Sequence, residues 1–489
     1  MRDFRHEPAS TERDLGVPLP DSVHACSVCL PTWASVIGYE EGRAKVLNRL
    51  KGGYPRFIRN PLVGRLTARA DEELSGENES VFLFPTRRGA QRAHRWIERK
   101  TGAAVRSSDF EGLQALIVPE TAVRAAREYQ RFTGELVSSR MAEDILNGGL
   151  QVGSKDHLLK RRLATIYSAG AKDVHVFSSG MAAVTALLRS LPALGEGKKT
   201  LQLEFPYVDT LKVQEQFGNG VVFLSQAEGE SFDEALRRTE KGEFAAVFVE
   251  IPSNPLLRTL DLPRLSAACR EGGVPLIVDD SAVGPHNVKV LPWADAVTCS
   301  LTKWLSGVGD VMGGAVVLRS DSAFVTELRT SLGEESADTS PLYLADTQVL
   351  LSNLKGYSQR MAVPNESAIR LVEMLSAHPG VQEVWHPSIT HTANYDAIKA
   401  PGGGYGGLFS FVLKNPKKSA KVFDSLALCK GPSFGTSFSL VSPYVLLAHY
   451  EELDWAEGCG VPPHLIRVSC GHEDASRLEE VFAEALKFA

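Results

Sequence analysis

The stretch that decides the fold is "GGVPLIVDDS" (residues 272–281), a short apolar run that ends in two carboxylates, Asp279 and Asp280. The next apolar run, "DAVTCSLTK" (residues 295–303), ends at Lys303. Short apolar runs bounded by glycine, proline or polar residues predict strands buried in a parallel sheet. Ligands of such sheets gather at the carboxyl ends of the strands, so the residues that close both runs are candidates for a binding site.

Strand-like and helix-like segments alternate on both sides of this pair, which predicts βα units and a mostly parallel sheet. Residues 1–65 are irregular and rich in Pro, Gly and Arg, which predicts an arm. The predicted strands are 81–85, 113–120, 173–179, 199–205, 245–252, 275–281, 295–302, 313–320, 381–387, 406–414 and 464–471. The predicted helices are 87–100, 121–132, 180–191, 261–273, 360–378, 419–429 and 475–488.

Composition excludes several classes of protein. The chain has 489 residues, of which 43% are hydrophobic, and this is ample for several domains and a large core. Its formal net charge is -6 and its basic clusters, such as 160–162, are short, so we expect no nucleic-acid partner. No long apolar run predicts a membrane span, and the polar start lacks the order of a secretory signal.

The seven cysteines are scattered and odd in number. Cys26 and Cys29 form one CxxC pair, but no second pair completes a zinc site, and the pair does not lie between a strand and a helix as in a redox motif. We therefore expect ordinary reduced thiols, no metal site and, by default, a cytoplasmic location.

Taken together, Lys303 and Asp279 predict a cofactor. Alone, Lys303 could be a surface lysine in a loop, and Asp279 a helix cap or turn residue. A lysine is a covalent nucleophile only when its amine can be neutral beside a carbonyl group. An acid at one strand end with a lysine after the next strand suits pyridoxal phosphate (PLP), because the carboxylate keeps the pyridine nitrogen protonated and the lysine holds the aldehyde as a Schiff base.

Other stretches supply the remaining parts of such a site. The turn 178–180 precedes a helix that begins near Met181, and backbone N–H groups at a helix N-terminus bind phosphate. Tyr207, just past a strand end, could cover one face of a flat cofactor or be a half-buried core tyrosine. Arg467 lies in an apolar strand, where it needs a partner, either a substrate carboxylate or an internal acid.

Five motifs in this order resemble the Cys/Met-metabolism PLP enzymes, which include cystathionine γ-synthases, cystathionine lyases and O-acylhomoserine sulfhydrylases. They are "SSGMAA" (178–183), "FVEIPSNP" (248–255), "LIVDDSAVG" (276–284), "CSLTKWLSGVGDVMGG" (299–314) and "LIRVSCGHED" (465–474). The resemblance covers the chain from Leu158 to its end. Five further stretches look like the fungal cystathionine γ-synthase branch: 27–42, 53–57, 132–143, 205–218 and 442–456.

The resemblance implies the α/β architecture of PLP-dependent transferases of fold type I, which is aspartate aminotransferase-like. An N-terminal arm (1–65) would precede a large PLP-binding domain (66–330) with a mostly parallel seven-stranded sheet and an insertion around 66–150. A small C-terminal α/β domain (331–489) would follow. The resemblance also implies a homodimer or homotetramer with active sites at the subunit interface.

By position, the resemblance makes Lys303 the Schiff-base lysine, Asp279 the partner of the pyridine nitrogen and Tyr207 the stacking ring, with Lys303 and Tyr207 catalytic. Ser433, with Arg467, would hold the α-carboxylate of an amino-acid substrate. The remaining residues implied to hold the cofactor are Ser179, Gly180, Met181, Ser300, Thr302 and Asn254.

The family's tyrosine-x-arginine pair, which the neighbouring subunit gives to the phosphate, has two candidates here. Tyr54 and Arg56 have the residue types but lie much farther from Gly180 in sequence than the family's pair does. Arg140 lies closer to Gly180 but has no accompanying tyrosine. The sequence does not decide between them.

Three departures from the family pattern suggest an altered substrate preference. Asp280 would add a charge near the cofactor ring, and Cys470 and His472 would lie close to Arg467.

The activity implied by the resemblance is a γ-substitution on an O-acyl-L-homoserine by way of a vinylglycine ketimine, which yields cystathionine when the nucleophile is cysteine. One alternative is a synthase of secondary metabolism that adds a carbon or amine nucleophile at Cγ, and another is a cystathionine lyase. A non-catalytic regulator would have lost Lys303 or Asp279, and both are present.

Overall fold

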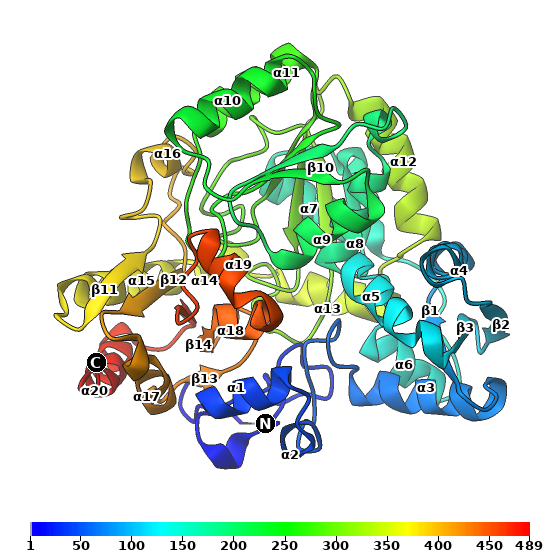
Figure 1. Cartoon of the computed structure of the whole chain (residues 1–489), viewed down its shortest axis with the longest axis horizontal. Coiled ribbons are helices and arrows are strands. Elements are labelled where there is room, and N and C mark those ends of the chain that lie inside the picture. Colours follow the sequence, from blue (N-terminus) through cyan, green and yellow to red (C-terminus); the bar gives the residue numbers. More distant parts are fainter. Residues whose placement is uncertain (1) are drawn as a thin grey trace.

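The computed structural model describes residues 2–489 and contains three β-sheets with helices around them. In Figure 1 the small sheet β1–β3 lies on the right, the C-terminal sheet on the lower left, and the blue N-terminal arm passes below and between them. The large sheet occupies the middle and upper part of the molecule.

The large sheet has seven strands in the order β4-β10-β9-β8-β7-β5-β6, which confirms the expected mostly parallel seven-stranded sheet. Only β10 runs antiparallel to its neighbours, β4 and β9. The strand β6 was not predicted, because its four residues are only half-buried at the sheet edge. The bounds are β4 (Val174–Phe177), β5 (Thr200–Leu203), β6 (Val221–Leu224), β7 (Val247–Glu250), β8 (Leu276–Asp279), β9 (Ala296–Ser300) and β10 (Gly314–Leu318).

Helices cover both faces of this sheet because its strands are apolar on both sides. Alternate residues of β8 show this: Leu276 and Val278 belong to a cluster with α7, α10 and α11, whereas Ile277 packs with α8, α9 and α12. The bounds are α7 (Asp156–Tyr167), α8 (Gly180–Arg189), α9 (Val208–Phe217), α10 (Gly229–Glu240), α11 (Leu262–Gly272) and α12 (Val325–Asp338).

The segment predicted as an insertion builds a sheet of its own. Its strands β1 (Glu79–Phe84), β2 (Arg106–Phe110) and β3 (Leu113–Pro119) are antiparallel in the order β1-β3-β2 and pack apolar side chains on both faces. The division of the chain at residues 65 and 330 stays a prediction. The helices of this part are α3 (Pro61–Leu74), α4 (Arg87–Thr101), α5 (Val123–Thr133) and α6 (Ser139–Leu146).

The C-terminal sheet has five strands in the order β11-β12-β15-β14-β13. Its strands are β11 (Val381–Trp385), β12 (Leu408–Leu413), β13 (Cys429–Lys430), β14 (Leu440–Pro443) and β15 (Ile466–Ser469). The helices from the linker to the C-terminus are α13 (Leu344–Asn353), α14 (Tyr357–Arg360), α15 (Ala362–Ala377), α16 (Thr392–Asp396), α17 (Ser419–Ser425), α18 (Tyr444–Ala448), α19 (Leu453–Gly458) and α20 (Ala475–Leu486).

The N-terminal arm is held by both neighbours. It contains α1 (Trp33–Glu40) and α2 (Ala44–Leu47). The backbone N–H of Cys26 donates to the Gly309 carbonyl at 2.8 Å, and that of Leu30 donates to the Lys430 carbonyl at 2.8 Å. The arm therefore bridges the loop after Lys303 and the C-terminal sheet.

Candidate active site

A cavity lies at the carboxyl ends of the central strands of the large sheet. Glu250, Asp279 and Ser300, which end β7, β8 and β9, form part of its floor. The N-terminus of α8 closes one side, and residues of the arm and of the C-terminal part close the others. The cavity therefore sits where the strand pattern predicts ligands to gather.

Lys303 projects its amine into this cavity. Its Nζ donates a hydrogen bond to Ser433 Oγ at 2.8 Å and lies 4.7 Å from the centre of the Tyr54 ring and 4.8 Å from that of Phe434. Burial, together with the nearby positive charge of Arg467, lowers the pKa of Lys303 to about 7. A substantial share of this amine is therefore neutral at neutral pH, as a nucleophile or a base requires.

The two adjacent aspartates point to opposite faces of the sheet. Asp279 lines the cavity, where its carboxylate accepts hydrogen bonds from the Ser281 N–H at 2.8 Å and the Thr298 hydroxyl at 3.1 Å. Asp280 instead accepts a hydrogen bond from the Tyr167 hydroxyl at 3.0 Å. The expectation that Asp280 adds a charge near the ring is wrong, because successive residues of a strand face opposite sides.

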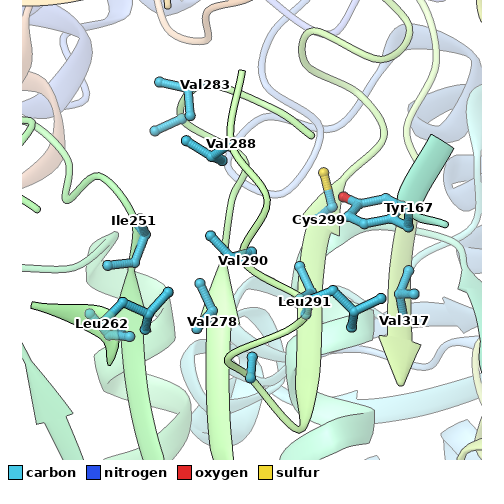
Figure 2. Close-up of a cluster of buried hydrophobic side chains, with 14 of the residues drawn as sticks. Tyr167, Ile251, Leu262, Val278, Val283, Val288, Val290, Leu291, Cys299 and Val317 are labelled. Carbon is cyan, nitrogen blue, oxygen red and sulfur yellow. The ribbon is translucent and has the colours of Figure 1, made fainter. Parts of the chain in front are cut away.

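Figure 2 shows the apolar cluster that contains Tyr167, the hydrogen-bond partner of Asp280, with Tyr167 beside Cys299 and with Val278 on the next strand. Burial in these surroundings raises the pKa of Asp280 to about 7. Burial also raises the pKa of Asp279.

A corner of the cavity is suited to a phosphate. Ser179 caps α8, accepting from the Ala182 N–H at 3.0 Å, and leaves the first N–H groups of the helix directed at the cavity edge near Gly180 and Met181. A Cβ on Gly180 would come within 3.1 Å of the Ser300 side chain, so the residue type keeps this corner open. Ser300 and Thr302 add hydroxyl groups to the same lining.

Tyr207 belongs to a buried polar cluster. Its backbone N–H donates to Glu250 Oε1 at 2.7 Å, and its hydroxyl accepts a hydrogen bond from Arg56. Arg56 also forms a salt bridge with Asp209, which is fully buried and lies 3.3 Å from a guanidinium nitrogen of Arg131. The cluster fixes the Tyr207 ring at the cavity wall.

The structure separates the two candidates for the tyrosine-x-arginine pair. Tyr54 and Arg56 line the cavity of their own chain. Arg140 is not among the cavity residues, because its guanidinium binds Asp310, at 3.2 Å, and Asp346, also at 3.2 Å. Which of the two reaches the phosphate in a neighbouring subunit stays a prediction.

Arg467 and Ser433 meet beside Lys303. Arg467 donates to Asn254 Oδ1 at 3.0 Å and to the Ser433 carbonyl at 3.1 Å. Ser433 adopts a φ of +94°, a conformation that costs a residue other than glycine about 1–3 kcal/mol. Gly435, two residues on, approaches so closely that a Cβ would lie 2.7 Å from the Trp304 backbone nitrogen.

Among residues 2–489, no carboxylate forms a salt bridge with the guanidinium of Arg467. The internal ion pair that the sequence left open is thus not found in this part of the chain, and the guanidinium is available to a carboxylate in the cavity.

Several cavity residues escaped the sequence analysis. Glu250 stood in the quoted motif 248–255 but was not singled out, although its position at a strand end was a usable signal. Tyr39 and Glu40 from the arm, and Tyr444 from α18, gave no such signal, because only the tertiary fold brings them to the cavity.

Cys470 and His472 do not reach the cavity. Cys470 is fully buried in the apolar core of the C-terminal sheet, and neither residue lies among the cavity residues. The expectation that they flank the substrate site near Arg467 is therefore wrong: the strand β15 directs Arg467 inward, and the chain turns away after it.

All seven cysteines are buried and none forms a disulfide. Within residues 2–489, no group of three His, Cys, Asp or Glu side chains could hold a metal ion, and no helix is long and apolar enough to span a membrane.

Comparisons with known proteins agree on one family. A family model described as "Cys/Met metabolism PLP-dependent enzyme" matches residues 154–487. The chain is 30% identical to the cystathionine γ-synthase of Neurospora crassa, over 97% of this chain and 98% of the relative. It is 33% identical to the L-2-amino-4-chloropent-4-enoate dechlorinase/desaturase of Streptantibioticus cattleyicolor, over 96% of this chain and 97% of the relative.

A solved structure shares the fold. The crystal structure of cystathionine γ-synthase from Xanthomonas oryzae pv. oryzae, in complex with aminoacrylate and cysteine, has a TM-score of 0.60 and 26% identity. The match covers 69% of this chain and 86% of that chain.

Proposed function

The chain belongs to the family of Cys/Met metabolism PLP-dependent enzymes, and from this premise we propose that it catalyses a γ-substitution on an O-acyl-L-homoserine, as a cystathionine γ-synthase does. One observation carries the proposal: a buried lysine amine with a pKa near 7 shares a cavity with a carboxylate at a strand end and with an arginine that pairs with no acid of the described chain.

The cofactor of this family is PLP, and the donor set of the cavity fits it. Lys303 supplies the amine, and Asp279 supplies a buried carboxylate for the pyridine nitrogen. The corner formed by Gly180, Ser300 and Thr302, at the N-terminus of α8, offers N–H and hydroxyl donors for a phosphate. When bound, the cofactor supplies a cationic ring that stabilises negative charge at the substrate's Cα and Cβ.

The chain's own residues would then orient the substrate and move its protons. Arg467 would bind the α-carboxylate through its planar pair of donors. The neutral amine of Lys303 would take the proton from Cα and deliver it to C4′ of the cofactor, which would leave the amine neutral again to take a proton from Cβ. The hydrogen bond between Lys303 and Ser433 directs the amine toward the side of the cavity where Arg467 would hold the substrate.

A second candidate is the loss of a leaving group without addition of a nucleophile. The similarity to the dechlorinase/desaturase of Streptantibioticus cattleyicolor supports it, since this relative matches the chain over nearly its whole length. Addition of a carbon or amine nucleophile at Cγ, and cleavage of cystathionine, would use the same first steps.

The test supplies the holoenzyme with O-acetyl-L-homoserine, with and without cysteine, and identifies products by mass. The proposal predicts release of acetate and formation of cystathionine that depends on cysteine, and it predicts that Lys303→Ala abolishes both. Acetate release that cysteine neither accelerates nor redirects would favour elimination, and turnover that survives Lys303→Ala would overturn the mechanism.

Assembly and location belong to the proposal as well. We expect a homodimer or homotetramer in the cytoplasm, and sedimentation of the purified holoenzyme tests the assembly. Tyr54 and Arg56 line the cavity of their own chain, and the expectation that the active sites lie at a subunit interface stays a prediction.

A further inference from the structure

The outer wall of the cavity differs from its floor. The floor is formed by the ends of strands, whereas the wall is formed by the end of α1 and by α18, which pack against each other. Tyr39 and Glu40 come from α1, and Leu447 and Ala448 come from α18. Glu40 is the one acid among these four residues. The other three are aromatic or apolar.

Glu40 stands apart from the other charged residues of the cavity. The Glu40 carboxylate has no hydrogen bond and no salt bridge among the described residues 2–489. Each of the other charged side chains at the cavity already has a hydrogen-bond partner in the protein, namely Arg56, Glu250, Asp279, Lys303 and Arg467. The carboxylate of Glu40 is therefore the one acid of this cavity whose binding capacity the described chain leaves unused.

The surroundings of Glu40 favour a cationic ligand. Burial raises its pKa to about 8, an effect that Glu451 strengthens and Arg131 weakens. Arg131 is not a dedicated partner, because its guanidinium pairs with Asp209 at 3.3 Å. A cation placed beside the carboxylate would stabilise its charged form through a charge-assisted hydrogen bond.

The first substrate cannot be this cation. In the proposed function its amine is committed to the cofactor and its carboxylate to Arg467. The remaining reactant is the nucleophile that attacks Cγ, which has to enter through the open side of the cavity. Glu40 on the outer wall is thus placed to select the nucleophile rather than the acyl-homoserine.

We propose that Glu40 binds the ammonium group of the cysteine nucleophile and so selects it over sulfide and over a thiol with a carboxylate alone. The inference rests on the proposed function and adds to it a residue that determines the choice of nucleophile. The thiol sulfur forms the new bond to Cγ, the acyl carboxylate leaves with the bonding electrons, and the thiol proton is released. The ammonium group takes no part in bond formation.

The test compares three thiols with the holoenzyme and O-acetyl-L-homoserine: cysteine, cysteamine, which lacks the carboxylate, and 3-mercaptopropionate, which lacks the amine. Initial rates of adduct formation give kcat/KM for each. We expect both amine-bearing thiols to exceed 3-mercaptopropionate by about tenfold or more, because a charge-assisted hydrogen bond contributes on this scale. In Glu40→Gln this preference falls by about tenfold, whereas kcat/KM for 3-mercaptopropionate is unchanged or rises.

Two further variants control the result. Glu40→Asp keeps the charge and retains part of the preference. Glu451→Gln removes a charge that influences Glu40 from outside the cavity, and it leaves the order of the three thiols unchanged. Equal melting temperatures and equal visible absorption of the bound cofactor show that Glu40→Gln folds and loads normally.

The outcomes separate the two proposals. Adducts that form with all three thiols in proportions unaltered by Glu40→Gln overturn the role of Glu40 and leave the γ-substitution intact. Absence of an adduct with every thiol in the unaltered enzyme overturns the γ-substitution itself, and the role of Glu40 falls with it.

Discussion

Two buried lysines, Lys303 and Lys430, show how surroundings decide what a lysine does. Burial lowers the pKa of both, to about 7 for Lys303 and about 8 for Lys430. Lys430 donates to the backbone carbonyls of Ser10, Pro31 and Asp424, at 3.3, 3.1 and 2.9 Å. Lys303 has one hydroxyl partner, two aromatic rings near its amine and an open cavity.

The difference separates a structural lysine from a reactive one. Three carbonyl oxygens satisfy the ammonium group of Lys430, so this side chain ties the N-terminal arm to the C-terminal part as a cation. The positive charge of Arg467 near Lys303 has the opposite effect, because it disfavours a second cation. A lowered pKa marks both lysines, and the cavity together with the neighbouring charge of Arg467 distinguishes Lys303.

The sharpest way to break the comparison is Lys303→Ala. In the proposed function this amine moves protons at the substrate, so its removal should lower turnover of O-acetyl-L-homoserine by about a thousandfold or more. The melting temperature of the apoprotein should hardly change, since the side chain faces a cavity. A large fall in melting temperature would show that Lys303, like Lys430, holds the fold together.

Lys430→Met is the converse experiment. It keeps the approximate length of the side chain but leaves three buried carbonyl groups without their donor, which should lower the free energy of unfolding by about 3 kcal/mol or more. Denaturant titration of the holoenzyme measures the change. Unaltered stability with lost activity would assign to Lys430 the role that we give to Lys303.

Arg467→Ala tests the charge that sets Lys303 apart. Loss of the carboxylate partner should raise KM for the amino-acid substrate by about tenfold to a hundredfold. The pKa of Lys303 should rise, because a neighbouring positive charge is removed. The kcat profile reports the substrate complex, in which the Lys303 amine is free, so a pH profile of kcat that keeps its midpoint in Arg467→Ala would contradict the electrostatic link between the two residues.

Asp280→Asn should have the smallest effect on catalysis and a measurable effect on stability. The pKa of Asp280 is raised from 3.8 to about 7 in the folded chain, so between these values the folded state binds more protons than the unfolded state. Its contribution to stability therefore falls as pH rises from about 4 to 7. In Asp280→Asn this part of the pH dependence should be lost while turnover stays within about twofold, as expected for a residue outside the cavity.

Denaturant titrations of the unaltered protein and of Asp280→Asn, each at pH 5 and pH 8, measure how much of the pH dependence of stability is lost. The raised pKa values of Asp279 and Glu250 act in both proteins and cancel in the comparison. Equal pH dependence in the two proteins would show that Asp280 is charged in the fold.

The floor of the cavity could be predicted from the sequence, because it consists of strand ends. Asp279 closes an apolar run, Lys303 follows the next one, and the Ser179–Gly180 turn links a strand to a helix. In each case the polar residue lies within a few positions of the apolar run that predicts the strand, so the end of the strand fixes its position. Six of the seven strands of the large sheet are predictable for the same reason, whereas the half-buried edge strand β6 is not.

The wall of the cavity was not predictable in this way. Glu40 and Tyr444 are brought together by the packing of the arm against α18, which no local pattern encodes. The orientation of Asp280 was missed although the strand period contains it, because the adjacent carboxylate was read as part of the same site. Two strands of the separate sheet in residues 79–119 were predicted, but the sheet itself was not. Its third strand, β2, has mostly exposed residues and therefore no apolar pattern.

The most direct test of the central claim is where the cofactor is attached. Borohydride reduction of the holoenzyme makes the link between lysine and cofactor permanent, and peptide mass spectrometry then locates it. We expect a phosphopyridoxyl group on Lys303 and none on Lys430. A phosphopyridoxyl group on Lys430, or on any other lysine while Lys303 stays unmodified, would contradict it.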